Sequence, residues 1–228
     1  MGEEGADDVH LRIKRAFHGI VRRRGVRPAR ALEVGGVTGP NSLLDAPELR
    51  GAERFCLNLL KMPEIDGVKT VAGNANDMRM FKDESFDIVL CNATLEHDKH
   101  FWRSVAEMHR VLRPGGLLVV GVPGYVKDPE RDHGLATHTY RVHYRFDYYR
   151  FSEQAVREVL FEGMRRVRVT RVMHPPRLIG HGVKPPRPPR FARIRRRARR
   201  IARRVPFARR IAAEMGGVRD RSRRRAAS

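Results

Sequence analysis

The sequence Arg30-Ala-Leu-Glu-Val-Gly-Gly-Val-Thr-Gly-Pro40 joins a short apolar run to a glycine-rich turn. Residues 31–34 are apolar except for Glu33, and three glycines follow them: Gly35, Gly36 and Gly39. Such a run, bounded by glycines and followed by a helical pattern, predicts a buried strand that enters a tight loop. Glycine allows the backbone to turn sharply and lets a ligand approach it closely. The amide groups at the start of the next helix then point toward that ligand.

Four segments carry the motifs of the chain. They are Leu32-Glu-Val-Gly-Gly-Val-Thr-Gly39, Val71-Ala-Gly-Asn-Ala-Asn-Asp77, Ser85-Phe-Asp-Ile-Val-Leu-Cys-Asn-Ala-Thr-Leu-Glu-His97 and Arg110-Val-Leu-Arg-Pro-Gly-Gly-Leu-Leu-Val-Val120. In this order they resemble the class I S-adenosylmethionine-dependent methyltransferases, in particular the type 11 methyltransferase-domain group. The resemblance covers residues 28–123 and continues more weakly to residue 172. It implies an α/β fold: a Rossmann-like, doubly wound, mostly parallel sheet of seven or six strands with helices on both faces.

The apolar pattern places the elements of this fold along the chain. A basic amphipathic helix over residues 9–24 would cover the cofactor or substrate site or pack on the sheet edge. Its apolar positions are Leu11, Ile13, Phe17, Ile20 and Val21. A first helix, or a short substitute for it, is expected after Pro40. The expected strands cover residues 31–34, 54–59, 68–72, 86–91, 117–122, 167–173 and, antiparallel, 177–183; helices cover residues 101–112, ended by Pro114-Gly-Gly, and 154–161.

The resemblance implies that S-adenosylmethionine is the cofactor and that the glycine-rich loop holds its methionine portion. The residues of that contact are Glu33, Gly35, Gly36 and Gly39. The loop departs from the family's Gly-x-Gly-x-Gly pattern, because Val37 replaces the middle glycine and adds bulk beside the methionine portion. The ribose is assigned to Asn58, at a position where family members usually carry an acid. An amide oxygen accepts a hydrogen bond there, without the charge that strengthens the bond to a carboxylate.

Polar residues after the third and fourth predicted strands are assigned to the adenine and to the methyl group. Asn74 and Ala75 bracket the adenine in the family pattern, although Gly73-Asn-Ala-Asn-Asp77 also has the composition of a simple turn. The run at residues 86–91 lacks polar alternation, as in a parallel strand buried on both faces. Open α/β sheets bind ligands at the carboxyl ends of such strands. Asn92 is therefore expected beside the reacting methyl group.

Glu96 and His97 are the candidate catalytic residues, since they follow Asn92 near the predicted transfer site. His97 is the better candidate base because imidazole titrates near neutral pH. Many methyl transfers require only in-line positioning of the nucleophile against the sulfonium. A role for both side chains in shaping the pocket is therefore favoured over proton transfer.

Charge is distributed unevenly along the 228 residues. The net charge is +21, and residues 187–228 contain 17 arginines against Glu214 and Asp220. No apolar run approaches the length that spans a bilayer, and the acidic start at residues 1–8, expected to be frayed, lacks the pattern of a secretory signal. The protein is therefore expected in the cytoplasm. Cys56 and Cys91 lie in strand-like runs, which favours reduced core thiols over a disulfide or a metal pair.

The long connection at residues 123–150 is expected to be a lid that forms one wall of the acceptor site. Its three histidines lack the short ligand spacing of metal sites, so no metal is expected. They are His133, His138 and His143. The connection belongs to a methyltransferase domain over residues 28–183, which follows an amino-terminal part over residues 1–27.

The carboxyl-terminal part of the chain is expected to lie outside that domain. Residues 184–190 are proline-rich and predict a semi-rigid linker. Within the tail at residues 191–228, apolar residues at three- or four-residue steps among the arginines of residues 191–211 predict a basic amphipathic helix. We rank an anionic membrane surface first as its partner, a disordered tail second and nucleic acid third.

These patterns predict a cytoplasmic methyltransferase, peripheral at the inner membrane face, that moves a methyl group from S-adenosylmethionine by in-line displacement. The acceptor would be a small molecule or a lipid-linked or saccharide compound. Val37 and Asn58 favour one alternative, a non-catalytic relative that keeps the fold as a binding module. The arginine-rich tail favours another, a nucleic-acid methyltransferase. Against it, Asn92-Ala-Thr-Leu95 is not the Asn/Asp-Pro-Pro-aromatic motif of enzymes that methylate base amines.

Overall fold

The computed structural model describes residues 3–127, 136–137, 146–173 and 176–187. All of these residues except 186 and 187 belong to one compact unit, Met1–Pro185. The tail at residues 191–228, most of the long connection with its three histidines, and the end of the proline-rich linker lie outside the described residues.

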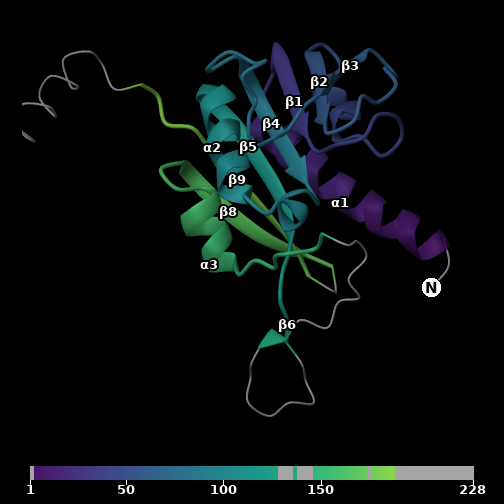
Figure 1. Cartoon of the computed structure of the whole chain (residues 1–228), viewed down its shortest axis with the longest axis vertical. Coiled ribbons are helices and arrows are strands. Elements are labelled where there is room, and N and C mark those ends of the chain that lie inside the picture. The colour runs from purple at the N-terminus through teal and green to yellow at the C-terminus, as the bar shows by residue number, and fades with distance from the viewer. Residues whose placement is uncertain (1–2, 128–135, 138–145, 174–175, 188–228) are drawn as a thin grey trace, which may run out of the picture. The chain divides into compact units, whose positions relative to one another are not determined.

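Seven strands form one mixed sheet in the order β3-β2-β1-β4-β5-β9-β8 (Figure 1). Their bounds are β1 (Arg30–Val34), β2 (Glu53–Asn58), β3 (Val68–Ala72), β4 (Phe86–Asn92), β5 (Leu112–Pro123), β8 (Arg165–Val172) and β9 (Arg177–Val183). The first five strands pair in parallel, whereas β9 runs antiparallel to both of its neighbours, β5 and β8. The predicted doubly wound, mostly parallel sheet is confirmed. Strand order reverses between β1 and β4, and ligands bind such sheets outside the carboxyl ends at that point.

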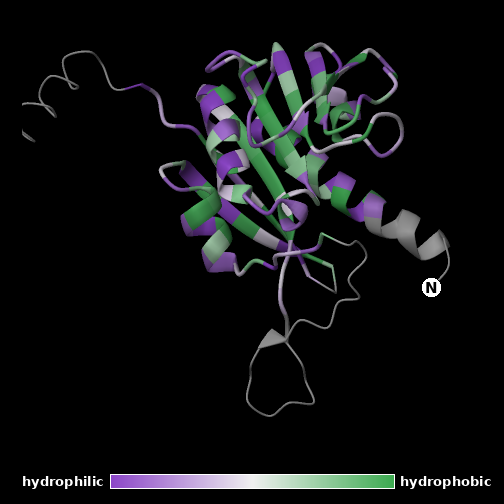
Figure 2. Cartoon of the chain, in the orientation of Figure 1, coloured by the Kyte–Doolittle hydropathy of each residue, from purple (hydrophilic) through white to green (hydrophobic). Residues whose placement is uncertain are grey.

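Helices cover both faces of the sheet (Figure 1). On one face α1 (Glu3–Arg24) packs in the same cluster as Ile88 and Leu90 of β4. On the other face α2 (Phe101–Val111) packs in the same cluster as Val89 and Cys91. Successive strand residues point to opposite faces, so a strand covered on both sides must be apolar at every position. Figure 2 shows the resulting contrast, with hydrophobic central strands and helices of mixed hydropathy.

α1 is longer than expected, because it begins at Glu3 and includes the acidic segment that was predicted to be frayed. Acidic residues stabilise the first turns of a helix, where the backbone N–H groups carry partial positive charge. Four of the five predicted apolar positions are buried: Ile13, Phe17, Ile20 and Val21. Leu11 is exposed.

Two 3-10 turns, η1 (Leu43–Asp45) and η2 (Pro47–Leu49), form the short substitute that was expected as one alternative to a first helix after the glycine-rich loop. Ser42 caps the first turn with its side chain, and the second begins with a proline, which cannot continue a preceding helix. The connections at residues 59–67 and 73–85, which are described throughout, contain no helix. The β1, β2 and β3 side of the sheet is therefore connected by loops that stay close to the strand ends.

β5 begins directly after α2, so Pro114-Gly-Gly does not separate the helix from the strand as predicted. These residues form the irregular start of β5, where Gly115 adopts a φ of +81° that favours glycine. A register shift between Phe86 and Ile88 of β4 accommodates the irregularity.

The late helix also differs from the prediction of one helix over residues 154–161. Ser152 caps a short α3 (Glu153–Ala155) by accepting a hydrogen bond from the Ala155 amide, 3.0 Å away. The chain continues as a π-helical turn, η4 (Val156–Leu160). Two further short strands, β6 (Val126–Lys127) and β7 (Ala136–Thr137), pair with each other outside the main sheet.

Cys56 and Cys91 are buried and free, on opposite faces of the sheet. Burial raises the pKa of both thiols to about 12, so neither is a thiolate at neutral pH. Within the described residues, no three or more His, Cys, Asp or Glu side chains form a group that could hold a metal ion. Among the described helices, none is long and apolar enough to cross a bilayer.

Candidate active site

Gly35 packs the glycine-rich loop against the end of β4. Its φ is +71°, and its amide donates to the Leu57 carbonyl at 2.8 Å. A Cβ at this position would lie 2.2 Å from Oγ1 of Thr94. Because Thr94 is β-branched and its Oγ1 donates to the Asn92 carbonyl at 3.0 Å, it cannot easily move away. Glycine is therefore required where the β1 and β4 ends meet.

Glu33 supports the loop from below with a buried carboxylate. Its Oε2 accepts hydrogen bonds from Ser42 Oγ at 2.8 Å and from the Leu43 amide at 3.0 Å. A Cβ at Gly36 would lie 2.3 Å from Cδ of Glu33, so the loop passes directly over this carboxylate. Burial raises the pKa of Glu33 to about 7, and the two hydrogen bonds oppose that rise. With only 3% of its surface exposed, Glu33 holds η1 under the loop.

Asn58 holds the loop from the side of β2. Its Nδ2 donates to the Gly36 carbonyl at 2.7 Å. A carboxylate has no proton to donate, so the acid usual in the family could not make this bond. The Oδ1 atom of Asn58 keeps its capacity to accept a hydrogen bond, as the predicted ribose contact requires. Val37, the other departure from the family pattern, directs its side chain partly to solvent and is 38% exposed.

α1 holds the outer part of the loop. Lys14 Nζ donates to the Pro40 carbonyl at 2.5 Å and pairs with the Asp45 carboxylate in η1. Nε2 of His18, one helical turn further on, lies 3.1 Å from Oδ1 of Asp45, and burial lowers the pKa of His18. The helix packs on the sheet and also contacts the loop. Its expected cover of the cofactor or substrate site stays a prediction.

The segment after β3 forms a hydrogen-bonded turn. Asn74 Oδ1 accepts from the Asn76 amide at 2.9 Å, and the Asn74 carbonyl accepts from the Asp77 amide at 2.9 Å. This is the turn that the sequence offered as the alternative to adenine binding. Asn76 in turn donates to Asp98 Oδ2 at 2.6 Å and to Ser104 at 2.9 Å, which ties the turn to the start of α2. Ala75, half-buried, packs against the core.

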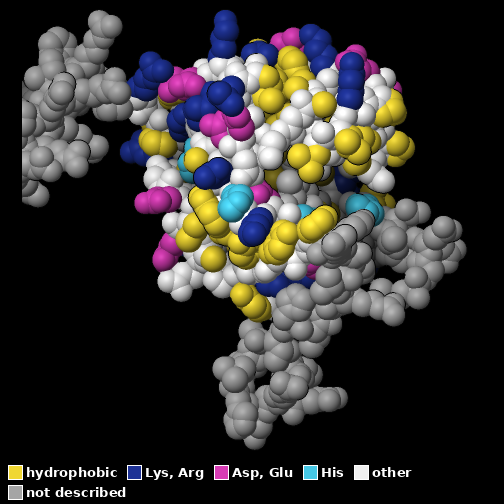
Figure 3. Space-filling view, viewed as in Figure 1, with side chains coloured by type: hydrophobic (Ala, Val, Ile, Leu, Met, Phe, Trp, Pro, Cys, Tyr) yellow, Lys and Arg dark blue, Asp and Glu magenta, His cyan; other side chains and the backbone are white. Residues whose placement is uncertain are grey.

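Exposed apolar side chains surround the loops after β1, β2 and β3, and the sequence reasoning singled out only Val37 among them. Leu59, the residue after Asn58, is 70% exposed, and Met80 lies over Gly73, whose Cβ would be 2.6 Å from Cε of Met80. The others are Val37, Leu60 and Ile65. Figure 3 shows hydrophobic side chains at the surface on this side of the molecule. Apolar residues next to the predicted strand ends were the sequence signal that could have identified these exposed side chains.

Asn92 lies where β4, β5 and α1 meet. A Cβ at Gly121 of β5 would be 2.4 Å from Asn92 Oδ1 and 3.0 Å from Cε2 of Phe17. Oδ1 is buried and has no hydrogen-bond partner among the residues that the structure describes. A buried acceptor without a partner costs free energy unless a ligand or a water donates to it. This arrangement fits the predicted position beside a ligand.

Glu96 is held by an arginine that sequence reasoning missed. Oε1 pairs with Nη1 of Arg177 at 2.9 Å, and the Glu96 carbonyl accepts from the Tyr148 amide at 2.8 Å. The other oxygen, Oε2, is buried and has no hydrogen-bond partner in the described part of the chain. Arg177 lies 81 positions further along, at the start of β9, and no local pattern marks it as a partner.

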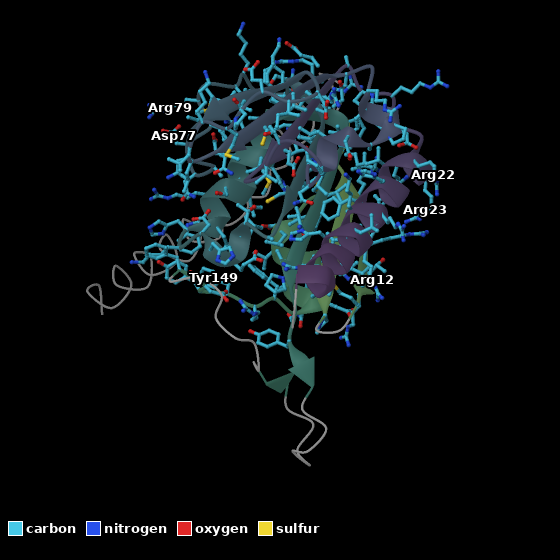
Figure 4. The ribbon with its side chains drawn as sticks, turned by 90° about the vertical axis from the view of Figure 1, so that its right-hand side faces the viewer. Arg12, Arg22, Arg23, Asp77, Arg79 and Tyr149 are labelled. Atoms are coloured by element: carbon cyan, nitrogen blue, oxygen red, sulfur yellow. The ribbon has the colours of Figure 1, made fainter. Side chains whose placement is uncertain are left out.

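His97 contacts the returning segment at residues 146–149. Its Nδ1 lies 3.0 Å from the Phe146 carbonyl, which can only accept, so Nδ1 carries a proton. Tyr149 Oη donates to the Lys99 carbonyl at 3.0 Å and fixes the same two segments together (Figure 4). The described end of the predicted lid therefore lies against Glu96 and His97.

The candidate site thus combines three predicted groups at the carboxyl ends of β1, β2 and β4. The structure brings Glu33, Gly35, Gly36 and Asn58 together in one braced loop. It brings Glu96 and His97 together beneath residues 146–149, with Asn92 between the sheet and α1. Asn74 is tied instead to the start of α2 through Asn76.

A methyltransferase-domain family matches residues 48–120 of this chain. The malonyl-[acyl-carrier protein] O-methyltransferase of Methylococcus capsulatus is 29% identical over 54% of this chain and 48% of its own length. A phthiotriol/phenolphthiotriol dimycocerosates methyltransferase of Mycobacterium ulcerans is 40% identical over 31% of this chain and 24% of its own length. The chain therefore spans about half the length, or less, of these curated relatives.

Solved structures share the fold. A Burkholderia thailandensis 1,6-didemethyltoxoflavin-N1-methyltransferase, solved with S-adenosylhomocysteine, is similar over 75% of this chain and 78% of its own, with a TM-score of 0.55 and 22% identity. A putative methyltransferase from a Haloferax volcanii complex with the activator Trm112 is similar over 80% and 93%, with a TM-score of 0.57 and 21% identity. The chain is therefore similar to S-adenosylmethionine-dependent methyltransferases in its matched domain, residues 48–120, and in its fold.

Proposed function

We propose that this protein transfers the methyl group of S-adenosylmethionine to a small-molecule or lipid-linked acceptor that carries a hydroxyl or amino group. Similarity to methyltransferases, one of them solved with S-adenosylhomocysteine, supports the cofactor. The observation that carries the proposal is the glycine-rich loop at the switch point of the sheet, which Glu33, Asn58 and Lys14 hold from three sides. A loop held in this way keeps the backbone open to a ligand without rearrangement on binding.

The residues present fit the cofactor. Gly35 and Gly36 let the loop pass directly against Thr94 and Glu33, where a Cβ would clash, as the tight turn beneath a cofactor requires. Asn58 Oδ1 would accept from the ribose, and Leu59 and Ala75 would contact the adenine with apolar surface. When bound, S-adenosylmethionine supplies an electrophilic methyl group on a sulfonium.

We propose that Glu96 shapes the acceptor site and that His97 assists proton removal where the acceptor requires it. Oε1 of Glu96 is already paired with Nη1 of Arg177 at 2.9 Å, which fixes the position of the carboxylate. His97 is held beside Glu96 by the contact between its Nδ1 and the Phe146 carbonyl, 3.0 Å away, and imidazole is a common general base. In this proposal Glu96 orients the acceptor, and His97 takes up its proton.

The class of acceptor is inferred from two buried oxygens that have no hydrogen-bond partner in the part of the chain that the structure describes. Asn92 Oδ1 and Glu96 Oε2 both accept hydrogen bonds, so a ligand that satisfies them must donate. Hydroxyl and amino groups donate and are also nucleophiles toward a sulfonium methyl. A purely apolar acceptor or one with only carbonyl groups would leave both oxygens unsatisfied.

Calorimetric titration of S-adenosylmethionine and S-adenosylhomocysteine into the full chain tests the proposal. We expect binding, and a loss of about tenfold or more in Gly35→Ala, because the new methyl group would meet Thr94 at the loop. Gly51→Ala is the matched control, since nothing lies within 4 Å of that position. Circular dichroism checks that each variant is folded. A folded wild-type protein that binds neither compound would contradict the proposal and favour the non-catalytic binding module.

We also propose that the protein is cytoplasmic and associates peripherally with anionic membrane surfaces through residues 191–211. The support is compositional: apolar residues recur at helical spacing among many arginines. Such a segment gains both apolar burial and attraction to acidic lipids.

A further inference from the structure

A set of arginines gathers at the end of the sheet opposite to the glycine-rich loop. Arg23 and Arg24 end α1, and Arg166 and Arg168 lie at the start of the edge strand β8. Nη2 of Arg24 donates to the Arg166 carbonyl at 2.9 Å and joins the two elements. We call these four residues the arginine cluster. Figure 4 shows Arg23, with its neighbour Arg22, near the end of α1 remote from Arg12.

The arginine cluster lacks acidic partners among the residues that the structure describes. Other arginines of the domain pair with a carboxylate, and they include Arg30, Arg79, Arg110, Arg113, Arg150 and Arg177. Arg24, in contrast, has a lowered pKa because it is partly buried and faces Arg168 and Arg166. Like charges held together in this way repel each other and destabilise the fold unless an anion joins them.

His181 of β9 lies beside the cluster. It pairs with Arg168 across the β8–β9 ladder and is only 7% exposed. Its Nδ1 has no hydrogen-bond partner within the described residues. Burial and, after it, the charges of Arg24, Arg168 and Arg23 together lower the pKa of His181 to about 4. This buried nitrogen lies near the charges of Arg24, Arg168 and Arg23, and an anion bound among them would give the ring an acceptor.

The backbone holds the two elements in place at this site. A register shift between Arg165 and Arg168 forms a bulge in β8, and Arg166 within it adopts a φ of +54°, which is uncommon for a side chain of this size. The hydrogen bond from Arg24 is made to the carbonyl of this residue. Bulges at sheet edges commonly redirect side chains, and this one lies where the arginines converge.

We propose that the arginine cluster and His181 form a binding site for a phosphate group, separate from the methyl-transfer site. Arginine is suited to this ligand because its planar guanidinium donates two parallel hydrogen bonds to phosphate oxygens. The phosphate would offset the repulsion among the arginines and satisfy the buried nitrogen of His181. The same group is supplied by free phosphate or by the headgroup of an acidic lipid, and the two sources are separated below.

Nuclear magnetic resonance of the His181 ring in the full chain tests the site, with inorganic phosphate as the probe and chloride at equal ionic strength as the baseline. His181→Asn assigns the signal. We expect phosphate to raise the pKa of His181 by about one pH unit, since an anion would face a ring otherwise surrounded by Arg23, Arg24 and Arg168. The double variant Arg24→Gln, Arg168→Gln should need about tenfold more phosphate for the same change.

Arg103→Gln is the matched control, because Arg103 is exposed on α2, which packs on the opposite face. It should leave the response to phosphate unchanged, and thermal unfolding checks that all variants are folded. A His181 signal that responds equally to phosphate and chloride, or that responds alike in wild type and the folded double variant, would overturn the proposal.

Vesicles distinguish the two sources of phosphate. If the site takes a lipid headgroup, the full-length double variant should bind phosphatidylcholine vesicles containing phosphatidylglycerol severalfold more weakly than Arg103→Gln does. Both variants keep the same arginine-rich tail, so its contribution cancels. If the site takes free phosphate, the two variants should bind these vesicles equally while only the double variant loses the His181 response. S-adenosylmethionine binding should be unchanged in either case.

Discussion

At the scale of single residues, Asn58 shows how a departure from a family pattern can be compensated within the same chain. The family's acid would strengthen a ribose contact, but only an amide both accepts from a ligand and donates to the Gly36 carbonyl. The glycine-rich loop of this protein contains Val37 and is connected by short turns in place of a helix. The hydrogen bond from Asn58 of β2 to the Gly36 carbonyl therefore supports the glycine-rich loop in place of a longer helix.

We expect Asn58→Asp to bind S-adenosylmethionine about tenfold more weakly than the wild type. The carboxylate would lose the bond to Gly36 and repel its carbonyl, and a lost hydrogen bond of this kind is worth about 1 kcal/mol or more. Calorimetry measures the change. Asn41→Asp, which adds the same charge at an exposed position of the same loop, is the control. Equal or tighter binding by Asn58→Asp would show that the bond to Gly36 does not matter.

Glu33 predicts a specific pH dependence of stability. Its pKa is raised from 4.5 to about 7, so between these values the unfolded chain releases a proton that the folded chain keeps. Raising the pH through this window therefore lowers the free energy of unfolding, by about 3 kcal/mol for the full shift.

Glu33→Gln should remove this contribution while keeping an oxygen that accepts from Ser42 and Leu43. Urea denaturation at several pH values between 4.5 and 7.5 measures the free energy of unfolding of both proteins. We expect the wild type to lose stability relative to Glu33→Gln as the pH rises. A constant difference across this range would mean that Glu33 is ionised in the folded protein throughout.

At the scale of elements, the two late strands depend on close packing against the π-helical turn η4. A Cβ at Gly180 of β9 would lie 2.5 Å from Cε2 of Phe161 and 2.7 Å from Cγ1 of Val156. Both side chains are buried in the core and cannot move into solvent. The absence of a side chain at this position lets η4 approach the sheet, so a short late helix is enough to cover it.

Gly180→Ala should therefore lower the free energy of unfolding by about 1–3 kcal/mol, as overpacking of a close-packed core does. Chemical denaturation of the variant and the wild type measures the difference. Gly51→Ala, at a position with open space around it, should change stability by less than about 0.5 kcal/mol. Similar stabilities for the two variants would show that η4 shifts to make room.

At the scale of the whole molecule, the basic and acidic residues are distributed unevenly between residues 1–186 and residues 187–228. Of the 47 lysines and arginines, 17 are arginines of residues 187–228, which contain only two acids. The compact unit Met1–Pro185 carries most of the acidic residues. Membrane attraction and methyl transfer are thus assigned to different parts of the sequence.

We expect the full chain to sediment with vesicles that contain acidic lipid at low salt, and to lose this binding as salt rises to about 0.5 M, because screening weakens attraction to the surface. A chain that ends at Pro186 should bind much more weakly. Absence of binding by the full chain at low salt would exclude the membrane proposal for residues 191–211.

By itself, the sequence determined the strand positions, the glycine-rich loop and the family, because these depend on residues close together along the chain. The run at residues 68–72 became β3, and that at residues 177–183 became β9, with the predicted bounds. Alternating or continuous apolar runs and glycine turns are local patterns. Helix ends were less accurate: α1 and the late helix depend on capping and packing that the pattern does not contain.

Only the tertiary structure decided which polar groups meet. Asn58 reaches Gly36 across 22 positions, Arg177 reaches Glu96 across 81, and Arg24 reaches Arg166 across 142. No periodicity relates residues so far apart, and the side-chain direction that brings them together is set by strand order and register. The strand pattern therefore predicted where a ligand binds, whereas the bracing of the loop, the buried acceptors and the arginine cluster beside His181 arise from the packing of the sheet.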